Sequence, residues 1–428
     1  MQPKVVHGLS ASFLRAVGAL CFACAACGGA VNGDVKTSDD DGSGGEGAGG
    51  EGGDGGRSSS GGWSGGTSGA AGKGDVPDAG ARSDDAKASD GDAAFVDPPP
   101  PAGLVPVIVA LGPGGRTAVS CNGGRQFRVN DFYKTPDDDH SANAVTGLAG
   151  GRGAIIASAG WGAPGRVFYS DNAVDWQELP SSSYTKLNGA TGPSTENTSS
   201  TFFDGAAFKV FWSHKVWTSE EGRAWKETSF QPTNISHIRN VQFYPKEKLL
   251  LMRVERDENG SRNFLMMTSS DLGRTFTVRS PRTTGCAAFE WGPVAQSHGV
   301  IVAGGSSGAV CRSQDGGATW TPVANLANLN SMFADQSALF AARGDELLRS
   351  EDGITWTRVL KAAGSVGVGA WSKDTGYAVS VSANGQLKFY RSDDGQAWVA
   401  SAAVSGTNFT PRFMQTAFVK PSPKCPGI

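Results

Sequence analysis

The sequence lacks a strong net charge, a metal-binding cysteine pattern beyond its first residues, and any apolar run long enough to cross a membrane. Its formal net charge is −3 over 428 residues. Residues 101–428 carry +4, which gives no support for nucleic-acid binding through bulk electrostatics. The four cysteines beyond residue 27 show no C-x-x-C spacing, so we expect no metal site and no cofactor. The apolar run Ala16–Ala26 has about eleven residues, too few for a membrane span.

Residues 1–27 have the features of a bacterial secretory signal, in which two basic residues accompany the apolar run. The stretch Cys24-Ala25-Ala26-Cys27 resembles a bacterial lipoprotein cleavage box, although Cys24 stands where leucine is usual. The resemblance implies lipidation of Cys27, and Gly28 after it implies sorting to the outer membrane. A plain signal peptide with a freely secreted product is the alternative.

Residues 28–103 are predicted to be a disordered linker. Between residues 28 and 100, 22 of 73 residues are glycine, only Trp63 and Phe95 are aromatic, and the net charge is −9. Such a composition cannot bury enough apolar surface to offset the entropy lost on ordering. The sequence therefore predicts a signal over 1–27, a linker over 28–103 and a folded domain over 104–428.

One stretch, Ser313-Gln314-Asp315-Gly316-Gly317-Ala318-Thr319-Trp320, recurs with variation along the folded domain. Ser313 and Asp315 are suited to accept hydrogen bonds from backbone N–H groups in a tight turn. Gly317 adopts a positive φ without a Cβ clash, and Trp320 brings a large apolar ring to a fixed position. Strand-forming residues flank the stretch, so it predicts a hairpin turn.

Seven copies of this stretch are spaced at intervals of 37 to 50 residues, beginning at Ser120, Ser170, Ser219, Ser269, Ser313, Ser350 and Ser392. A period of about 40–50 residues with four strand-sized segments is typical of a β-propeller blade. The sequence therefore predicts an all-β fold, a seven-bladed β-propeller of four-stranded blades. Further turn-forming and ring residues of the better copies are Asp271, Gly273, Phe276, Asp352, Trp356, Asp394 and Trp398.

The repeated stretch resembles the Asp-box, or BNR, repeat of bacterial sialidases, sortilin-type receptors and photosystem-assembly propellers, which reads S-x-D-x-G-x-T-W/F. The copies at Ser269 and Ser313 match in full, three copies lack one turn residue, and those at Ser120 and Ser170 also lose the aspartate. The resemblance covers residues 104–428. It implies that these residues shape turns on the side of the ring away from the ligand.

Blade 1 contains too few strands before its repeated turn. Only Val105–Leu111 and Arg116–Ser120 precede that turn, whereas Arg412–Val419 follows the last copy without a turn of its own. We expect Arg412–Val419 to be the innermost strand of blade 1. Such an arrangement closes the ring and removes its exposed sheet edges.

Cysteines at positions 121, 286, 311 and 425 suggest two disulfides in an exported domain, with three possible pairings. Cys121 ends the third strand of blade 1 and Cys425 follows the closing strand. Because those strands are parallel, both cysteines are expected at one edge of the ring, which favours Cys121–Cys425 as a clasp. Cys286–Cys311 then lies within blade 5, whose innermost strand is predicted over Ala287–Val294.

Catalysis of the sialidase type requires three arginines converging on a carboxylate, a Tyr–Glu nucleophile pair and an acid–base aspartate. The family's F/Y-R-I-P arginine motif is absent from this sequence. Single residues on or beside the expected innermost strands are candidates for ligand binding: Arg239, Tyr244, Glu290, Trp291, Trp371 and Arg412. They are scattered along the chain, so no catalytic residue is assigned.

Two charged segments have simpler interpretations. The run Asp137–Asp139 offers carboxylate oxygens for Ca²⁺ but lacks the glycine-punctuated spacing of a calcium loop, so a solvated loop is favoured. The segment Arg253–Arg262 mixes both charge signs and is predicted to be an exposed turn.

The sequence thus favours a monomeric, lipid-anchored propeller that faces outward and acts as a non-catalytic binding or scaffold module for a glycan or protein ligand. A sialidase-like glycoside hydrolase or lyase acting on extracellular polysaccharide is the alternative. A structural surface protein with no small ligand is a third possibility. Two carboxylates, or an arginine with a tyrosine and a glutamate, gathered at one end of the channel would favour the enzyme.

Overall fold

The computed structural model describes residues 99–132, 145–159, 166–179, 201–212, 215–230, 235, 237–244, 247–258, 261–279, 286, 292–305, 308–402, 404 and 408–425. Its regular structure consists of 28 β-strands and one short 3₁₀ helix, η1 (Pro113–Gly115). The prediction of an all-β fold is confirmed. No helix within these ranges is long and apolar enough to span a membrane.

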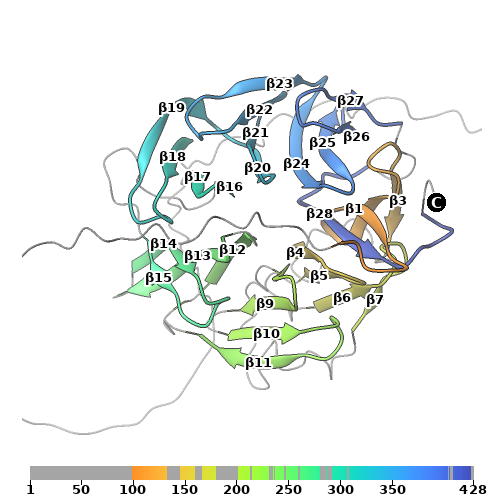
Figure 1. The fold of residues 1–428 in the computed structure, drawn as a ribbon, viewed down its shortest axis with the longest axis horizontal. Helices are drawn as coiled ribbons and strands as arrows, with labels where there is room; N and C mark the ends of the chain where they lie inside the picture. Colours follow the sequence, from red (N-terminus) through yellow and green to blue (C-terminus); the bar gives the residue numbers. More distant parts are fainter. Residues whose placement is uncertain are drawn as a thin grey trace, which may run out of the picture. The chain divides into compact units, whose positions relative to one another are not determined.

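Seven four-stranded antiparallel sheets are arranged radially as the blades of a propeller (Figure 1). From the innermost strand outward, blade 1 consists of β28 (Phe413–Val419), β1 (Val105–Leu111), β2 (Arg116–Ser120) and β3 (Arg128–Asp131). Blade 2 consists of β4 (Val145–Gly150), β5 (Ile155–Ala159), β6 (Arg166–Ser170) and β7 (Gln177–Glu178). Blade 3 consists of β8 (Thr201–Phe203), β9 (Phe208–Trp212), β10 (Lys215–Ser219) and β11 (Lys226–Ser229). Blade 4 consists of β12 (His237–Tyr244), β13 (Leu249–Glu258), β14 (Ser261–Ser269) and β15 (Thr277–Val278).

The remaining three blades follow the same order from the innermost strand outward. Blade 5 is β16 (Val294–Ser297), β17 (Val300–Gly304), β18 (Ala309–Ser313) and β19 (Thr321–Ala327). Blade 6 is β20 (Ser331–Ala334), β21 (Leu339–Arg343), β22 (Glu346–Ser350) and β23 (Thr357–Lys361). Blade 7 is β24 (Ser365–Ser372), β25 (Gly376–Ala383), β26 (Gln386–Ser392) and β27 (Val399–Ala400). The predicted seven-bladed propeller of four-stranded blades is confirmed.

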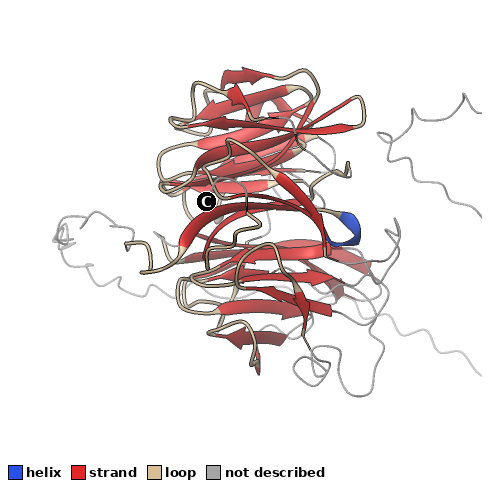
Figure 2. Ribbon diagram, turned by 90° about the vertical axis from the view of Figure 1, so that its right-hand side faces the viewer, coloured by secondary structure: helices blue, strands red, loops and turns tan. Residues whose placement is uncertain are grey.

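The ring has two different edges. Within a blade, neighbouring strands are antiparallel, so the innermost and third strands end at the same edge. The repeated turns join the third strand to the outermost strand there, and we name it the turn edge. The other edge carries the connections from each outermost strand to the next blade, and we name it the crossover edge. Helix η1, drawn blue in Figure 2, lies at the crossover edge.

The ring closes through a strand from the far end of the chain. β28 and β1 pair antiparallel from Val105↔Val419 to Leu111↔Phe413. The expected closing strand is therefore confirmed, beginning at Phe413. β1 and β2 therefore have strand partners on both sides, and β1 is no longer an edge strand near the axis.

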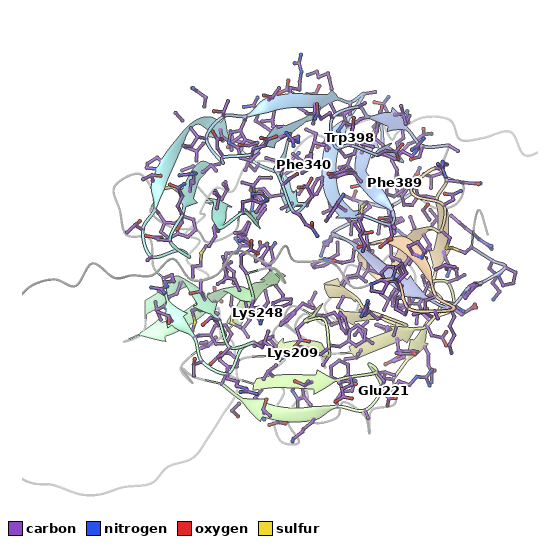
Figure 3. The ribbon with its side chains drawn as sticks, viewed as in Figure 1. Lys209, Glu221, Lys248, Phe340, Phe389 and Trp398 are labelled. Atoms are coloured by element: carbon purple, nitrogen blue, oxygen red, sulfur yellow. A yellow bond between two sulfur atoms is a disulfide. The ribbon has the colours of Figure 1, made fainter. Side chains whose placement is uncertain are left out.

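Each seam between neighbouring blades contains its own apolar cluster, and the seven clusters correspond to the seven seams. In the seam between blades 6 and 7, Phe340 and Trp398 lie beside each other with ring centroids 6.4 Å apart (Figure 3). Full burial of one such side chain stabilises a fold by about 1.5–3 kcal/mol. The blades therefore hold one another, as in other repeat architectures, and no single central core exists among the described residues.

The predicted innermost strand of blade 5, Ala287–Val294, is wrong. β16 begins at Val294 and turns into β17 through His298 and Gly299, whose φ values are 50° and 73°. Two consecutive positive φ values form a tight hairpin turn that matches the twist of its strands. Pro293 has no N–H to donate to a strand ladder, which favours a strand that begins after it.

The predicted exposed turn over Arg253–Arg262 is wrong in its first part. β13 continues to Glu258, and Arg253 and Glu255 are only 8% and 1% exposed. Successive strand residues point to opposite faces, and a blade packs against a neighbour on each face. Alternating charge along β13 therefore does not place these side chains in solvent.

Candidate functional site

The repeated turns are held by a fixed set of hydrogen bonds. In blade 5, the Ser313 hydroxyl accepts from the Gly317 N–H at 2.8 Å and donates to Asp315 at 2.8 Å. Asp315 accepts from the Thr319 backbone N–H at 2.9 Å and from the Thr319 hydroxyl at 2.6 Å. The Trp320 indole donates to the Gly317 carbonyl at 2.8 Å, which fixes the ring over the turn. Gly317 has φ of 87°, so glycine suits this position.

Most other copies repeat this pattern, whereas in blade 3 Glu221 stands in the place of the aspartate and the Ser219 hydroxyl accepts from the Gly222 N–H at 2.8 Å. In blades 4, 6 and 7 a glycine N–H again donates to the serine hydroxyl, and a backbone N–H donates to the aspartate carboxylate. The residues of these copies are Ser269, Asp271, Gly273, Phe276, Ser350, Asp352, Trp356, Ser392, Asp394 and Trp398. In blades 1 and 2, Asn122 and Asn172 replace the aspartate, and their side-chain oxygens accept the equivalent backbone bonds. The asparagine copies therefore preserve the turn geometry without its charge.

The carboxylates of these turns have low pKa values because they accept hydrogen bonds. Bonds from the Thr319 hydroxyl and backbone lower the pKa of Asp315 to about 2. Bonds from the backbone N–H groups of Thr355 and Ile354 lower the pKa of Asp352 to about 2. The shifts thus have a structural cause, and they do not mark a general acid or base.

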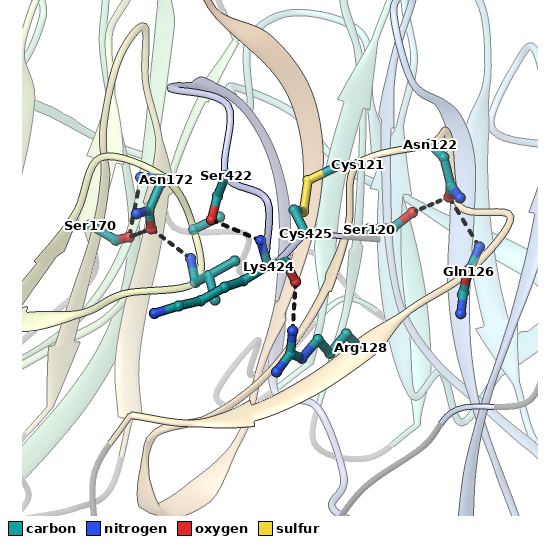
Figure 4. The surroundings of a disulfide bond; sticks show 12 residues. Ser120, Cys121, Asn122, Gln126, Arg128, Ser170, Asn172, Ser422, Lys424 and Cys425 are labelled. Carbon is teal, nitrogen blue, oxygen red and sulfur yellow. Dashed lines mark hydrogen bonds between the residues drawn. A yellow bond between two sulfur atoms is a disulfide. The ribbon is translucent and has the colours of Figure 1, made fainter. Parts of the chain in front are cut away.

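Both favoured disulfides are present. Cys121–Cys425 joins blade 1 to the segment after β28, and Cys286–Cys311 joins blade 5 to the segment before β16. Around the first, the Arg128 guanidinium donates to the Lys424 carbonyl at 2.8 Å (Figure 4). Two disulfides are typical of a protein that folds outside the reducing cytoplasm.

The C-terminal segment also binds blade 2. Lys424 forms an ion pair with Asp175 at 2.6 Å, and Lys420 forms one with Asp171 at 2.9 Å. A hydrogen bond from Lys424 is the main cause of the lowered pKa of Asp175. The segment after β28 therefore fastens the closing strand to the turn edges of blades 1 and 2.

The candidate ligand residues from the sequence do not form one site in the described part. Tyr244 and Trp371 lie at or beside the ends of β12 and β24, at the turn edge. Arg412 is exposed and directly precedes β28, at the crossover edge. The Tyr244 hydroxyl donates to the Gln242 side chain, and Trp371 packs near Tyr377 with centroids 5.9 Å apart.

Several other predicted site residues are not placed by the structure. The side chain of Arg239 lies outside the described residues, although its backbone belongs to β12. Glu290 and Trp291 precede β16 and lie outside the described residues, as do Cys27 and the acidic run Asp137–Asp139. Within the described ranges, no group of histidine, cysteine, aspartate or glutamate side chains is arranged to hold a metal ion.

Sequence reasoning missed a buried polar group between blades 4 and 5. Arg253 on β13 and Gln296 on β16 are 8% and 3% exposed, and each has side-chain atoms without a hydrogen-bond partner. Arg253 stands in the charged segment that was assigned to solvent, and Gln296 stands beyond the strand predicted for blade 5. The continuous apolar run at 249–252, followed directly by Arg253, Val254 and Glu255, was the available signal for a strand that continues past Arg253.

The two edges of the ring differ in the length of their connections. At the turn edge the repeated turns are short and similar. At the crossover edge two connections are short, those between blades 5 and 6 (328–330) and between blades 6 and 7 (362–364). Three connections there are long, those between blades 1 and 2 (132–144), between blades 2 and 3 (179–200), and between blades 4 and 5 (279–293). Long, varied connections on a rigid scaffold are where binding residues concentrate.

These features define a seven-bladed β-propeller closed by its last strand and clasped by a disulfide. No protein-family model and no curated protein matches the chain. Similar solved structures include YCF48 bound to D1 peptide (13% identity, 64% of this chain, 85% of that chain, TM-score 0.45) and YCF48 from Cyanidioschyzon merolae (15%, 63%, 88%, 0.42). BamB from Moraxella catarrhalis is another (8%, 68%, 89%, 0.36). With TM-scores below 0.5, the fold assignment rests on the strand pairing described above.

Proposed function

We propose that this chain is an exported propeller that binds a protein or glycan ligand without catalysis and serves as a binding or scaffold module. The contrast between the two edges of the ring carries this proposal. At the turn edge the aspartates of blades 4 to 7 are engaged in similar turns, whereas the crossover edge varies in connection length from blade to blade. A rigid ring that presents diverse loops on one side is suited to recognition.

The position of the chain ends leaves the crossover edge away from the entry of the chain into the ring. The folded part enters the ring at Val105, which pairs with Val419 at the turn edge. A tether formed by the residues before it attaches to that side. The crossover edge therefore lies opposite the point where the chain enters the ring.

The repeated turns support relationship to the Asp-box propellers. Their serine, aspartate and aromatic residues make the local contacts that such a motif needs. In this proposal the protein is a monomeric lipoprotein of the Asp-box type with its ligand at the crossover edge. A sialidase-like activity gains no support from the described residues, because Tyr244 and Arg412 lie at opposite edges.

A binding screen with the full-length mature chain tests the ligand proposal. The chain is applied to a glycan array and to immobilised surface-protein extracts, and each hit is measured again with Arg412→Ala, at the crossover edge, and Arg274→Ala, an exposed residue of a repeated turn. We expect Arg412→Ala to weaken binding several-fold and Arg274→Ala to leave it unchanged. Binding that is lost only with Arg274→Ala contradicts the assignment of the ligand to the crossover edge.

The lipid anchor has a separate test. Wild-type protein and Cys27→Ser are expressed with labelled fatty acid, and the membrane and soluble fractions are compared. Lipidation predicts label on the wild type and release of the variant from membranes. If the wild-type protein never takes up the label, the lipid anchor is contradicted. The ligand proposal is unaffected by that result, because the binding screen tests it separately.

A further inference from the structure

The hairpin that joins β25 to β26, at the crossover edge of blade 7, carries an exposed Asn-Gly dipeptide. Asn384 and Gly385 form its two-residue turn, and Ala383 pairs with Gln386 at the end of the ladder. The φ values of Asn384 and Gly385 are 51° and 73°, the two positive angles of a type I′ turn. Both residues are exposed, and a Cβ added to Gly385 would meet no atom within 4 Å. Solvent therefore has free access to the dipeptide.

An asparagine that precedes a glycine can react with its own main chain. The main-chain nitrogen of the glycine attacks the side-chain carbonyl carbon, Cγ, and glycine has no Cβ to hinder that approach. The reaction requires a side-chain amide that is free to turn and a glycine N–H that no acceptor holds. Local hydrogen bonds therefore decide which Asn-Gly dipeptides of a folded protein react.

The turn of Asn384 and Gly385 meets both requirements. In a type I′ turn the ladder hydrogen bonds join the flanking residues, so the Gly385 N–H takes no part in them. Within the described ranges, neither the Asn384 side chain nor the Gly385 N–H forms a hydrogen bond with another residue. Both reacting groups are therefore unengaged at this hairpin.

The other Asn-Gly dipeptide among the described residues, in the repeated turn of blade 1, is held in place. The Oδ1 of Asn122 accepts from the Ser120 hydroxyl at 3.0 Å and from the Gln126 N–H at 3.1 Å. The Asn122 side chain can turn toward the nitrogen of Gly123 only after both bonds break. The same two residue types thus stand in a held and a free environment within one protein.

We propose that Asn384 is a deamidation site, at which the chain modifies itself without an enzyme or a cofactor. The Gly385 nitrogen forms a bond to Cγ of Asn384 and loses its proton. The bond between Cγ and Nδ2 breaks, and ammonia leaves with that proton. Water then opens the five-membered imide, either at Cγ to give aspartate or at the main-chain carbonyl carbon to give isoaspartate. Neither step transfers an electron, and water is the single co-reactant.

The two products change the hairpin differently. Aspartate tolerates a positive φ as asparagine does, so it keeps the turn and adds one negative charge to the crossover edge. Isoaspartate lengthens the main chain by one atom, so the pairing of Ala383 with Gln386 must shift. The charge and shape of this hairpin therefore change with the age of the protein, whether or not a ligand binds at the crossover edge.

The test compares the two asparagines within one sample. The full mature chain is kept at neutral pH for several weeks, and mass spectrometry of its peptides locates each conversion of an amide to an acid. Isoaspartate is measured by enzymatic methylation with a labelled methyl donor. We expect Asn384 to convert about tenfold faster than Asn122, because two hydrogen bonds hold the Asn122 side chain. In reduced protein unfolded by guanidinium chloride the two rates should converge, since neither side chain is then held.

One variant assigns the reaction to the Gly385 nitrogen. Gly385→Asn keeps the positive φ but places a side chain beside the attacking nitrogen, so conversion at Asn384 should slow several-fold. Fragment ions distinguish Asn384 from the introduced asparagine. Native wild-type protein in which Asn384 converts no faster than Asn122 overturns the proposal, as does an unchanged rate at Asn384 in Gly385→Asn.

Discussion

Cys121 and Cys425 are separated by 304 residues in sequence, yet a disulfide joins them with their Cα atoms 6.0 Å apart. The bond lies where the closing strand leaves blade 1, beside the ion pair of Lys424 with Asp175. Covalent and ionic contacts therefore secure the same junction that the β28–β1 ladder forms.

The clasp disulfide should contribute more stability than the disulfide of blade 5. In the chain-entropy model, a closed loop of 304 residues is worth about 5–6 kcal/mol and one of 25 residues about 3–4 kcal/mol. We expect Cys121→Ala with Cys425→Ala to lower the free energy of unfolding more than Cys286→Ala with Cys311→Ala. Urea denaturation without reductant measures both. Equal losses would show that strain or residual structure outweighs the loop term.

Removal of residues 408–428 should prevent the ring from closing. The truncation deletes β28 and Cys425, so β1 loses its inner partner and Cys121 its disulfide. We expect aggregation or loss of the native fold, seen by size-exclusion chromatography and circular dichroism. Deletion of 28–95 is the control, and it should shift the melting temperature by only a few degrees, because a segment of that composition contributes little packing. A truncated protein that stays monomeric and melts like the wild type contradicts closure by β28.

The charge of Asp315 should make its turn sensitive to acid. Its pKa is about 2 in the folded protein, mainly through bonds from Thr319, against an ordinary value of 3.8. A carboxylate with a lowered pKa adds stability that is full above about pH 4 and is lost as pH falls toward 2. Asp315→Asn should therefore keep the turn at neutral pH but reduce the loss of stability between pH 5 and pH 2.

Two further variants separate charge from hydrogen bonding. Asp315→Ala removes the acceptor itself and should cost about 1 kcal/mol at neutral pH. Asn122→Asp introduces a carboxylate that can accept the bonds from Ser120 and Gln126 in blade 1, so it should increase acid sensitivity. Unfolding curves at several pH values measure each effect. An Asp315→Asn profile parallel to that of the wild type would show that the charge plays no part.

Gly150 should tolerate no side chain. A Cβ at this position would lie 2.0 Å from the backbone carbonyl oxygen of Thr416, across the seam between blades 2 and 1. Gly150→Ala must separate β4 from β28 and should cost at least about 1–3 kcal/mol. Gly385→Asn is the control, since Gly385 has φ of 73° with open space around it and asparagine tolerates that conformation. Thermal unfolding measures the stability of the two variants. A Gly150→Ala protein as stable as the Gly385→Asn control would contradict close packing between β4 and β28.

The sequence predicted those parts of the fold that depend on local contacts. The turn around Ser313 and Asp315 is made by residues within a few positions of one another, so each copy is visible in sequence and the count of copies gives the count of blades. Closure by β28 followed from the missing strand of blade 1. The pairing of Cys121 with Cys425 followed from the direction of the strands that precede them.

Contacts between blades could not be read in the same way. Arg253 appears in sequence as part of a charged segment, and only the packing of blade 5 against β13 shows that it is buried. Gln296 is not singled out in sequence, because the innermost strand of blade 5 is predicted over Ala287–Val294, whereas β16 is Val294–Ser297. Tyr244 and Arg412 both belong near the channel, but their separation onto opposite edges depends on where each strand begins and ends.

The pairing of Val105 with Val419 means that the ring has no intrinsic beginning. Its two ends are partners in one ladder, so a short peptide could join them without moving a strand. New ends placed in the short connection at 328–330 would then leave all 28 strands in their sheets. The order in which the gene encodes the blades is therefore one of several equivalent orders, and circular permutation is open to this architecture.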